Sequence, residues 1–370
     1  MNPQRAAHAV RAGKSCLHLI LSVGTILIAA FAASCGGGGG GGSSATHNAY
    51  ISLPQAGTIA LLRIKTESGQ VGVASQTAPV VGTAPVGLAV HPSGKFLYAA
   101  NSAQDTISIF NVAGDGALTQ TGTTVKTGAG PRTITLDPSG HFLLVLNNTG
   151  DSISVFSVDA SGSLAQVGSP VAAGDRPADL KVTPSGSFVY VTNPNSGFVL
   201  GFSLAGDGTL TSLGAPFAAR VGAGFIAIDP SSKFLYTTNA TDGSISAFSI
   251  DASGTLHTIV PNYPAGTAPA GIAMDPSAKF LYVANQGSNN MAGFTIAADG
   301  ELTPMASFVT GVTSPLFVAA EPAGTFIYVG NQSGNGISSF SYDATTGVLT
   351  AVSGSPFDVG KAPGAITMVP

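Results

Sequence analysis

The stretch Pro177–Arg220, PADLKVTPSGSFVYVTNPNSGFVLGFSLAGDGTLTSLGAPFAAR, decides the fold. Its pattern returns along the chain with a fixed period of 46 residues. The asparagine that closes the second apolar run marks the period, and it recurs at Asn101, Asn147, Asn193, Asn239, Asn285 and Asn331. A constant period of this size indicates a repeat architecture in which each unit is one supersecondary element.

Each unit contains four short apolar runs in which apolar and polar residues alternate. Around Asn147 the runs are Ile134–Asp137, Phe142–Leu146, Ser152–Phe156 and Leu164–Val171. Asp-Pro-Ser-Gly and Asp-Ala-Ser-Gly clusters separate them, and such residues form tight turns. Four short strands joined by hairpins make one propeller blade, so the sequence predicts an all-β propeller of four-stranded blades.

The two ends of the repeat fix the number of blades. The inner run has seven copies, which begin at or after Pro85, Pro131, Pro177, Ala223, Pro269, Pro315 and Pro363. The first unit, from Tyr50, has no inner run before it, whereas the chain ends after a supernumerary inner run, Gly364–Val369. We therefore predict a seven-bladed ring in which the C-terminal strand completes the N-terminal blade and leaves no open sheet edge.

Residues 1–35 are expected to form a secretory signal outside the fold. The basic start contains Arg5, Arg11 and Lys14, and the apolar stretch Leu17–Ala33 is short for a membrane span. Its end, Ala32-Ala-Ser-Cys35, resembles a bacterial lipoprotein cleavage box with Ala in place of the usual Leu. That resemblance implies lipidation of Cys35 and a membrane partner, and Gly36 implies the outer membrane. An ordinary signal cut near Ser34, or an uncleaved anchor, is the alternative.

The segment 36–47 is predicted to be a flexible tether, and the propeller is predicted to span 48–370. The tether opens with the unbroken glycine run Gly36–Gly42, followed by Ser43 and Ser44. A Gly/Ser chain of this length has a mean reach of about 20 Å. The sequence therefore predicts a propeller that lies close to the membrane of the cell envelope.

Composition excludes several classes of function. The chain has two cysteines, Cys16 and Cys35, and neither lies in the predicted fold, so we expect no disulfide, thiol catalysis, metal site or cofactor there. Beyond the signal, eleven Lys and Arg stand against eighteen Asp and Glu, a net charge of −7. Because nucleic acids require a basic face, they are not expected as partners.

The two rims of the predicted ring differ in variability. The turns between blades repeat almost unchanged, whereas the rim where inner strands begin varies and is rich in amides. Propellers bind ligands on such a variable rim, which makes Asn148, Asp151 and Asn195 candidate ligand-binding residues. The alternative is that they are ordinary loop residues.

One charged cluster breaks the repeat at its inner strands and contains Arg132, Arg176, Asp179 and Lys181. Charges at such positions are costly unless they pair or reach water. Asp179 and Lys181 are two residues apart and could neutralise each other between blades. Alternatively, the four side chains line the channel mouth and bind an anionic or polar ligand.

The repeat resembles a known family. Tyr190–Asn193 is the YVTN motif, and with Gly130-Pro-Arg132 and Asp137–Phe142 it is similar to the lactonase-type seven-bladed propellers, which include 6-phosphogluconolactonases and muconate-lactonising enzymes. The resemblance covers Asn48–Pro370. It implies lactone hydrolysis, but Thr133 stands where lactonase members have His, and Asn148 stands where they have an acid.

Two functional hypotheses follow. The favoured one is a membrane-tethered scaffold whose variable rim binds a glycan, a peptide or another envelope protein. The alternative is a lactone hydrolase resembling 6-phosphogluconolactonase. In that enzyme Arg132 would stabilise the oxyanion, Asp179 would activate water, and Arg176 and Lys181 would hold the substrate.

Overall fold

The computed structural model describes residues 45–369 except 77–83, 123, 260–261 and 307–308. The predicted signal peptide, the lipidation residue Cys35 and the glycine run of the tether lie outside the described residues. All regular elements of the described part are β-strands. That part contains no helix with the length and apolarity needed to cross a membrane.

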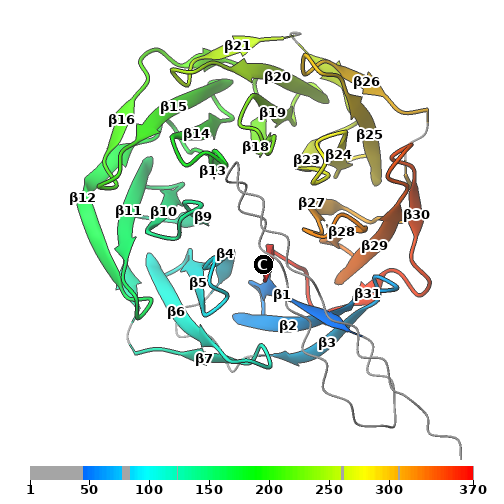
Figure 1. Ribbon diagram of the computed structural model, residues 1–370, viewed down its shortest axis with the longest axis horizontal. Helices are drawn as coiled ribbons and strands as arrows, with labels where there is room; N and C mark the ends of the chain where they lie inside the picture. The colour runs from blue at the N-terminus through cyan, green and yellow to red at the C-terminus, as the bar shows by residue number, and fades with distance from the viewer. Residues whose placement is uncertain (1–44, 77–83, 123, 260–261, 307–308, 370) are drawn as a thin grey trace, which may run out of the picture. The chain divides into compact units, whose positions relative to one another are not determined.

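Seven antiparallel sheets stand in a ring around a central axis (Figure 1). We number the sheets as blades 1 to 7 from the N-terminus. The inner strands of blades 1 to 7 are β32 (Ile366–Met368), β4 (Pro85–Val90), β9 (Pro131–Leu136), β13 (Leu180–Val182), β18 (Ala223–Ile228), β23 (Pro269–Met274) and β27 (Pro315–Ala320). The second strands are β1 (Thr46–Leu53), β5 (Phe96–Asn101), β10 (Phe142–Asn147), β14 (Phe188–Asn193), β19 (Phe234–Asn239), β24 (Phe280–Asn285) and β28 (Phe326–Asn331).

The third strands are β2 (Thr58–Lys65), β6 (Thr106–Val112), β11 (Ser152–Val158), β15 (Phe198–Leu204), β20 (Ser244–Ile250), β25 (Asn290–Ile296) and β29 (Gly336–Tyr342). The outer strands are β3 (Val71–Gln76), β7 (Leu118–Gln120), β8 (Val125–Lys126), β12 (Leu164–Ala172), β16 (Leu210–Ser212), β17 (Phe217–Ala218), β21 (Leu256–Thr258), β22 (Tyr263–Pro264), β26 (Leu302–Pro304), β30 (Leu349–Ala351) and β31 (Phe357–Asp358). In four blades of the described part, two short outer strands replace the single one expected. Glycine and proline interrupt them, as Gly214 and Pro216 do between β16 and β17.

The predicted closure of the ring is confirmed. β32 pairs with β1, with Tyr50 opposite Thr367, and Figure 1 shows the red C-terminal end beside the blue N-terminal strand. The Gly364 and Ser52 backbones extend this pairing by a hydrogen bond of 2.9 Å. The propeller begins slightly earlier than predicted, at Thr46 rather than Asn48, because Thr46 and His47 already pair with β2.

The core is divided into clusters that lie between neighbouring blades. One apolar residue of each inner strand occupies an equivalent position in its repeat, and this column is at most 9% exposed at Leu88, Ile134, Leu180, Ile226, Ile272 and Val318. Its seventh member, Ile366, is only partly buried. Burial of one apolar column per blade therefore holds the seven sheets face to face.

A repeated contact joins each blade to the next at the turn face. The second-strand Phe ring packs under a glycine of the following blade's outer turn, so closely that a Cβ on Gly254 would lie 2.4 Å from the Phe188 ring. The Tyr190 hydroxyl donates to the carbonyl of the same Gly254 at 2.7 Å. The same pair of contacts recurs at Tyr98 and Phe96 with Gly162, and at Tyr236 and Phe234 with Gly300. We call this arrangement the glycine clasp.

Burial also keeps the clasp hydroxyls protonated. Loss of solvent around the buried Tyr50 phenol raises its pKa to about 12, and burial raises the pKa of Tyr190 further. The Tyr50 hydroxyl donates to the Gly116 carbonyl at 2.7 Å. These tyrosines therefore remain hydrogen-bond donors across the physiological pH range.

Candidate functional site

Arg132 lies on a β-bulge at the rim end of β9. Asn147 pairs with Pro131 and Leu146 pairs with Thr133, so Arg132 is the extra residue of its strand. A bulge re-aims the side chain that it carries. The Arg132 side chain is exposed, and no ion pair in the described part of the chain includes it. The sequence-predicted cation is therefore available to a ligand at this rim.

Asp179 is not available in the same way. Its carboxylate is 4% exposed and accepts hydrogen bonds from three consecutive blades. Oδ1 accepts from the Thr133 hydroxyl at 3.3 Å and from the Leu180 amide at 2.9 Å, while Oδ2 accepts from the Ile226 amide at 3.0 Å. The ion pair with Lys181, one of the two alternatives from the sequence, is not among the ion pairs of the described residues, and neutral donors hold the carboxylate instead. Asp179 thus ties the inner strands β9, β13 and β18 together.

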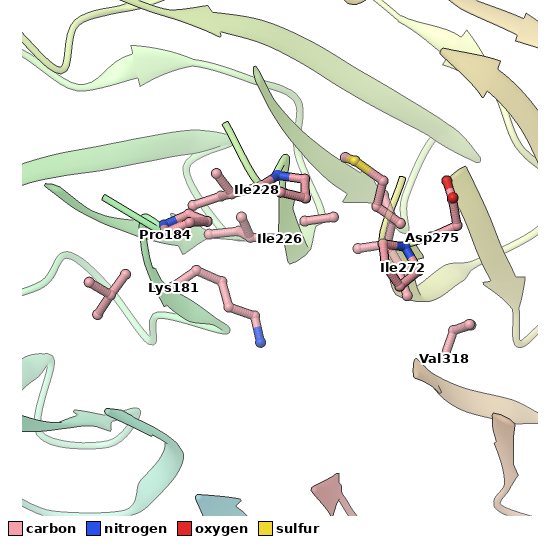
Figure 2. Close-up of a pocket in the computed structure, with 13 residues that line it drawn as sticks. Lys181, Pro184, Ile226, Ile228, Ile272, Asp275 and Val318 are labelled. Carbon is pink, nitrogen blue, oxygen red and sulfur yellow. The ribbon is translucent and has the colours of Figure 1, made fainter. Parts of the chain in front are cut away.

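Lys181 points into the central channel instead of joining the other three charges. It lines a cavity of about 330 Å³ near the turn end of the channel, and Figure 2 shows its amino nitrogen directed into the open space. The other walls are formed mainly by apolar side chains and turn prolines, Val182, Pro184, Ile226, Ile228, Pro230, Ile272, Met274, Pro276 and Val318. None of Arg132, Arg176 and Asp179 lines this cavity.

The one acid of the cavity wall does not neutralise Lys181. Asp275 is 1% exposed, and its carboxylate accepts from the Ser277, Lys279 and Phe280 amides of its own turn. In the described part of the chain, the ion pairs are Arg220 with Asp242 and Asp251 with His257. Among the residues that the structure describes, Lys181 therefore has no ion-pair partner, and it lies in a mostly apolar cavity.

The Asp151 side chain accepts a hydrogen bond from the backbone of Arg176 rather than from its guanidinium. The Asp151 Oδ1 accepts from the Arg176 amide at 2.7 Å, and both residues have positive φ angles. Asp105 and Asn289 accept from Gly130 and Ser314 in the same way. Because an amide side chain serves as well as a carboxylate, this interaction holds the loop and does not require the charge.

The predicted rim amides are also engaged in loop contacts. Asn148 Nδ2 donates to the Pro177 carbonyl at 2.8 Å, which links blade 3 to blade 4. Asn195 Nδ2 donates to the Asp175 carboxylate at 3.0 Å on the exposed rim. The structure thus distributes the predicted residues over the rim, a buried tie between blades and a channel cavity.

The cavity around Lys181 was not predicted as a site. Its signal was present in the sequence, since the column Ala89, Thr135, Lys181, Ala227, Ala273, Ala319 and Thr367 contains one charge. We grouped Lys181 with its chain neighbours, and so placed that charge either at the channel mouth with the other three or in an ion pair with Asp179. No group of three or more His, Cys, Asp or Glu residues in the described ranges could hold a metal ion.

Comparison with known proteins identifies the family. The family described as lactonase, 7-bladed beta-propeller, matches residues 43–176, 146–222 and 254–366, which is well over half of the chain. The chain belongs to this lactonase family. No curated protein matches the chain.

Solved structures resemble this lactonase-family propeller over its folded part. A candidate 6-phosphogluconolactonase from Bacteroides uniformis has a TM-score of 0.79 at 22% identity, covering 88% of this chain and 99% of that one. A periplasmic gluconolactonase from Pseudomonas aeruginosa has a TM-score of 0.77 at 19% identity, with coverages of 88% and 99%. At these identities the likeness establishes the fold alone.

The structure gives the two departures from the lactonase pattern a structural use. Thr133, where the family resemblance leads one to expect His, donates its hydroxyl to the Asp179 tie. Asn148, where an acid is expected, donates to a backbone carbonyl of the next blade. In this lactonase-family member, Thr133 therefore helps to join inner strands, and Asn148 links the loop after β10 to the following blade.

We expect Asp179→Asn to destabilise the propeller by about 1–3 kcal/mol, because one carboxylate oxygen becomes an amide that faces backbone N–H donors. Chemical unfolding of the variant measures this loss. Asp175→Asn is the matched control, since Asp175 is exposed, and it should change the free energy of unfolding by less than about 0.5 kcal/mol. Equal stability of the two variants would contradict the tie.

Proposed function

We propose that this chain is a binding propeller of the bacterial cell envelope, whose central channel holds a small ligand with an anionic head group and an apolar body. The observation that carries the proposal is the unpaired Lys181 ammonium in a cavity with mostly apolar walls. An ammonium beside apolar surface loses hydration, and a ligand anion would compensate for that loss. The apolar body would pack against Ile226 and Ile272.

Binding is favoured over catalysis at the predicted cluster because the predicted base is occupied. Lactone hydrolysis needs a group that accepts a proton from water. The Asp179 carboxylate is buried and accepts hydrogen bonds from three N–H or O–H donors. It therefore supports the inner strands and does not face a substrate.

The proposed location rests on the N-terminal sequence. Residues 1–35 resemble a lipoprotein signal, and Cys35 would carry the lipid that joins the protein to the membrane. The Gly/Ser segment that precedes β1 would tether the propeller, and its mean reach of about 20 Å would hold the propeller beside the outer membrane. In this position the variable rim could also meet a glycan, a peptide or another envelope protein.

Substitution of Lys181 tests the channel site. Isothermal titration of the full chain with hexanoate, which has an anionic head and an apolar body, should show binding, and Lys181→Ala should weaken this binding at least tenfold, the equivalent of about 1.4 kcal/mol. Thr135→Ala is the control, because Thr135 occupies the same column of blade 3. Unchanged binding in Lys181→Ala would contradict the proposal.

Lactone hydrolysis is the second candidate, and the family match favours it. The exposed Arg132 could stabilise an oxyanion at the rim. Among the similar structures, one is a periplasmic gluconolactonase, so an enzyme of this fold outside the cytoplasm has a precedent. The likeness is too distant to transfer that activity.

A panel of lactones that includes 6-phosphogluconolactone separates the two candidates. If the binding proposal is correct, the full chain hydrolyses none of these lactones to its hydroxy acid faster than the uncatalysed rate. Turnover that falls at least a hundredfold in Arg132→Ala would establish the hydrolase and replace the binding proposal. If the chain turns over a lactone and Arg132→Ala does not change the rate, catalysis takes place elsewhere and the assignment of Arg132 as a catalytic residue is wrong.

A further inference from the structure

Blade 4 breaks a side-chain contact that its neighbours keep. The recurring second-strand asparagine is at most 2% exposed in all six repeats. In blades 2, 3 and 5 its Nδ2 donates to two hydroxyls of the third strand, as Asn147 does to Ser152 and Ser154. In blade 4 the corresponding residues are Phe198 and Leu200.

The consequence is a buried amide without partners. Asn193 is 1% exposed, and neither its Nδ2 nor its Oδ1 has a hydrogen-bond partner in the described part of the chain. A buried polar group in this condition has lost its hydration and gained no bond in return. A serine at position 198 would restore the contact that the neighbouring blades make.

Phe198 is also exposed, so its ring does not belong to the hydrophobic core. Its side chain is 38% exposed, and Val221 beside it is 54% exposed. Both line a hollow of about 350 Å³ at the variable rim, where blade 4 joins blade 5. A hydroxyl residue at position 198 would therefore make the fold more stable than phenylalanine does. The presence of phenylalanine is accounted for if a ligand covers its ring.

Two charged side chains flank this apolar surface. Arg220 Nη1 lies 3.1 Å from Asp242 Oδ2, and both side chains are partly exposed and line the hollow. The surrounding loops are held in place, because Ala219 donates to the Gly197 carbonyl and Gly222 donates to the Pro194 carbonyl, each at 2.8 Å. The hollow is thus preformed, with an apolar floor and a polar edge.

We propose that this hollow binds one pyranose ring of a neutral glycan. A pyranose has an apolar C–H face, which would stack on Phe198 and Val221, and a rim of hydroxyls that both donate and accept hydrogen bonds. Arg220 would donate to these hydroxyls and Asp242 would accept from them. Because the paired charges neutralise each other, a neutral sugar suits the hollow better than a charged ligand. The site is separate from the channel cavity, since no residue lines both.

The absence of tryptophan from the chain provides a direct test. Phe198→Trp in the full chain would place a single indole in the hollow, and titration with the glucose trisaccharide cellotriose should shift its emission in a saturable way. Adding Arg220→Ala should weaken this binding at least tenfold. Val348→Trp is the matched control, because Val348 is 59% exposed and does not line the hollow, and its emission should not respond. Equal responses of the two reporters, or a response only to a phenylalanine-rich peptide, would overturn the proposal.

A second variant separates binding from folding. Phe198→Ser should raise the melting temperature by roughly 2 °C, because Asn193 regains a hydroxyl partner, and should weaken cellotriose binding at least tenfold by isothermal titration. A residue that serves only the fold would show the opposite change in stability. Unchanged sugar binding in Phe198→Ser overturns the proposal, whichever way the melting temperature moves.

Discussion

The glycine clasp is the contact on which the ring depends. Blades 2 to 7 each place a phenylalanine ring against a glycine of the following blade, where no side chain could fit, and blade 1 places Asn48 there instead. In most blades a tyrosine hydroxyl also donates to the carbonyl of this glycine. Since the clasp sets the spacing between neighbouring blades, repeating it around the axis sets the curvature that closes the ring. The pairing of β1 with β32 then removes the last free sheet edge.

Most of this fold could be predicted from sequence because the constraint repeats. The constant spacing of the asparagines predicted the blade, and the inner run missing from the first unit together with the extra inner run at the C-terminal end predicted the closure. The split outer strands were not predicted, since glycine and proline interrupt alternation that is already weak there. The clasp partners lie about 64 residues apart in different units, so a reading of one unit at a time does not connect Tyr190 with Gly254.

The site was less predictable because a linear cluster of charges does not remain a cluster in space. Arg132, Asp179 and Lys181 lie on adjacent inner strands, yet the bulge turns Arg132 outward, backbone amides enclose Asp179, and Lys181 enters the channel. Blade 4 departs from the repeat in both directions. Asp179 is buried and links neighbouring inner strands. Phe198 is exposed on the rim, and because it replaces a hydroxyl residue, the buried Asn193 side chain has no hydrogen-bond partner among the described residues.

The clasp is tested most directly by the stability of Gly254→Ala. Gly254 has a φ of +83°, and its added Cβ would collide with the Phe188 ring, so we expect a loss of about 2–4 kcal/mol in the free energy of unfolding. Gly206→Ala is the control, because nothing lies within 4 Å of its added Cβ, and it should change stability by less than about 1 kcal/mol. If Gly254→Ala unfolds at the same denaturant concentration as Gly206→Ala, the clasp does not hold the blades together.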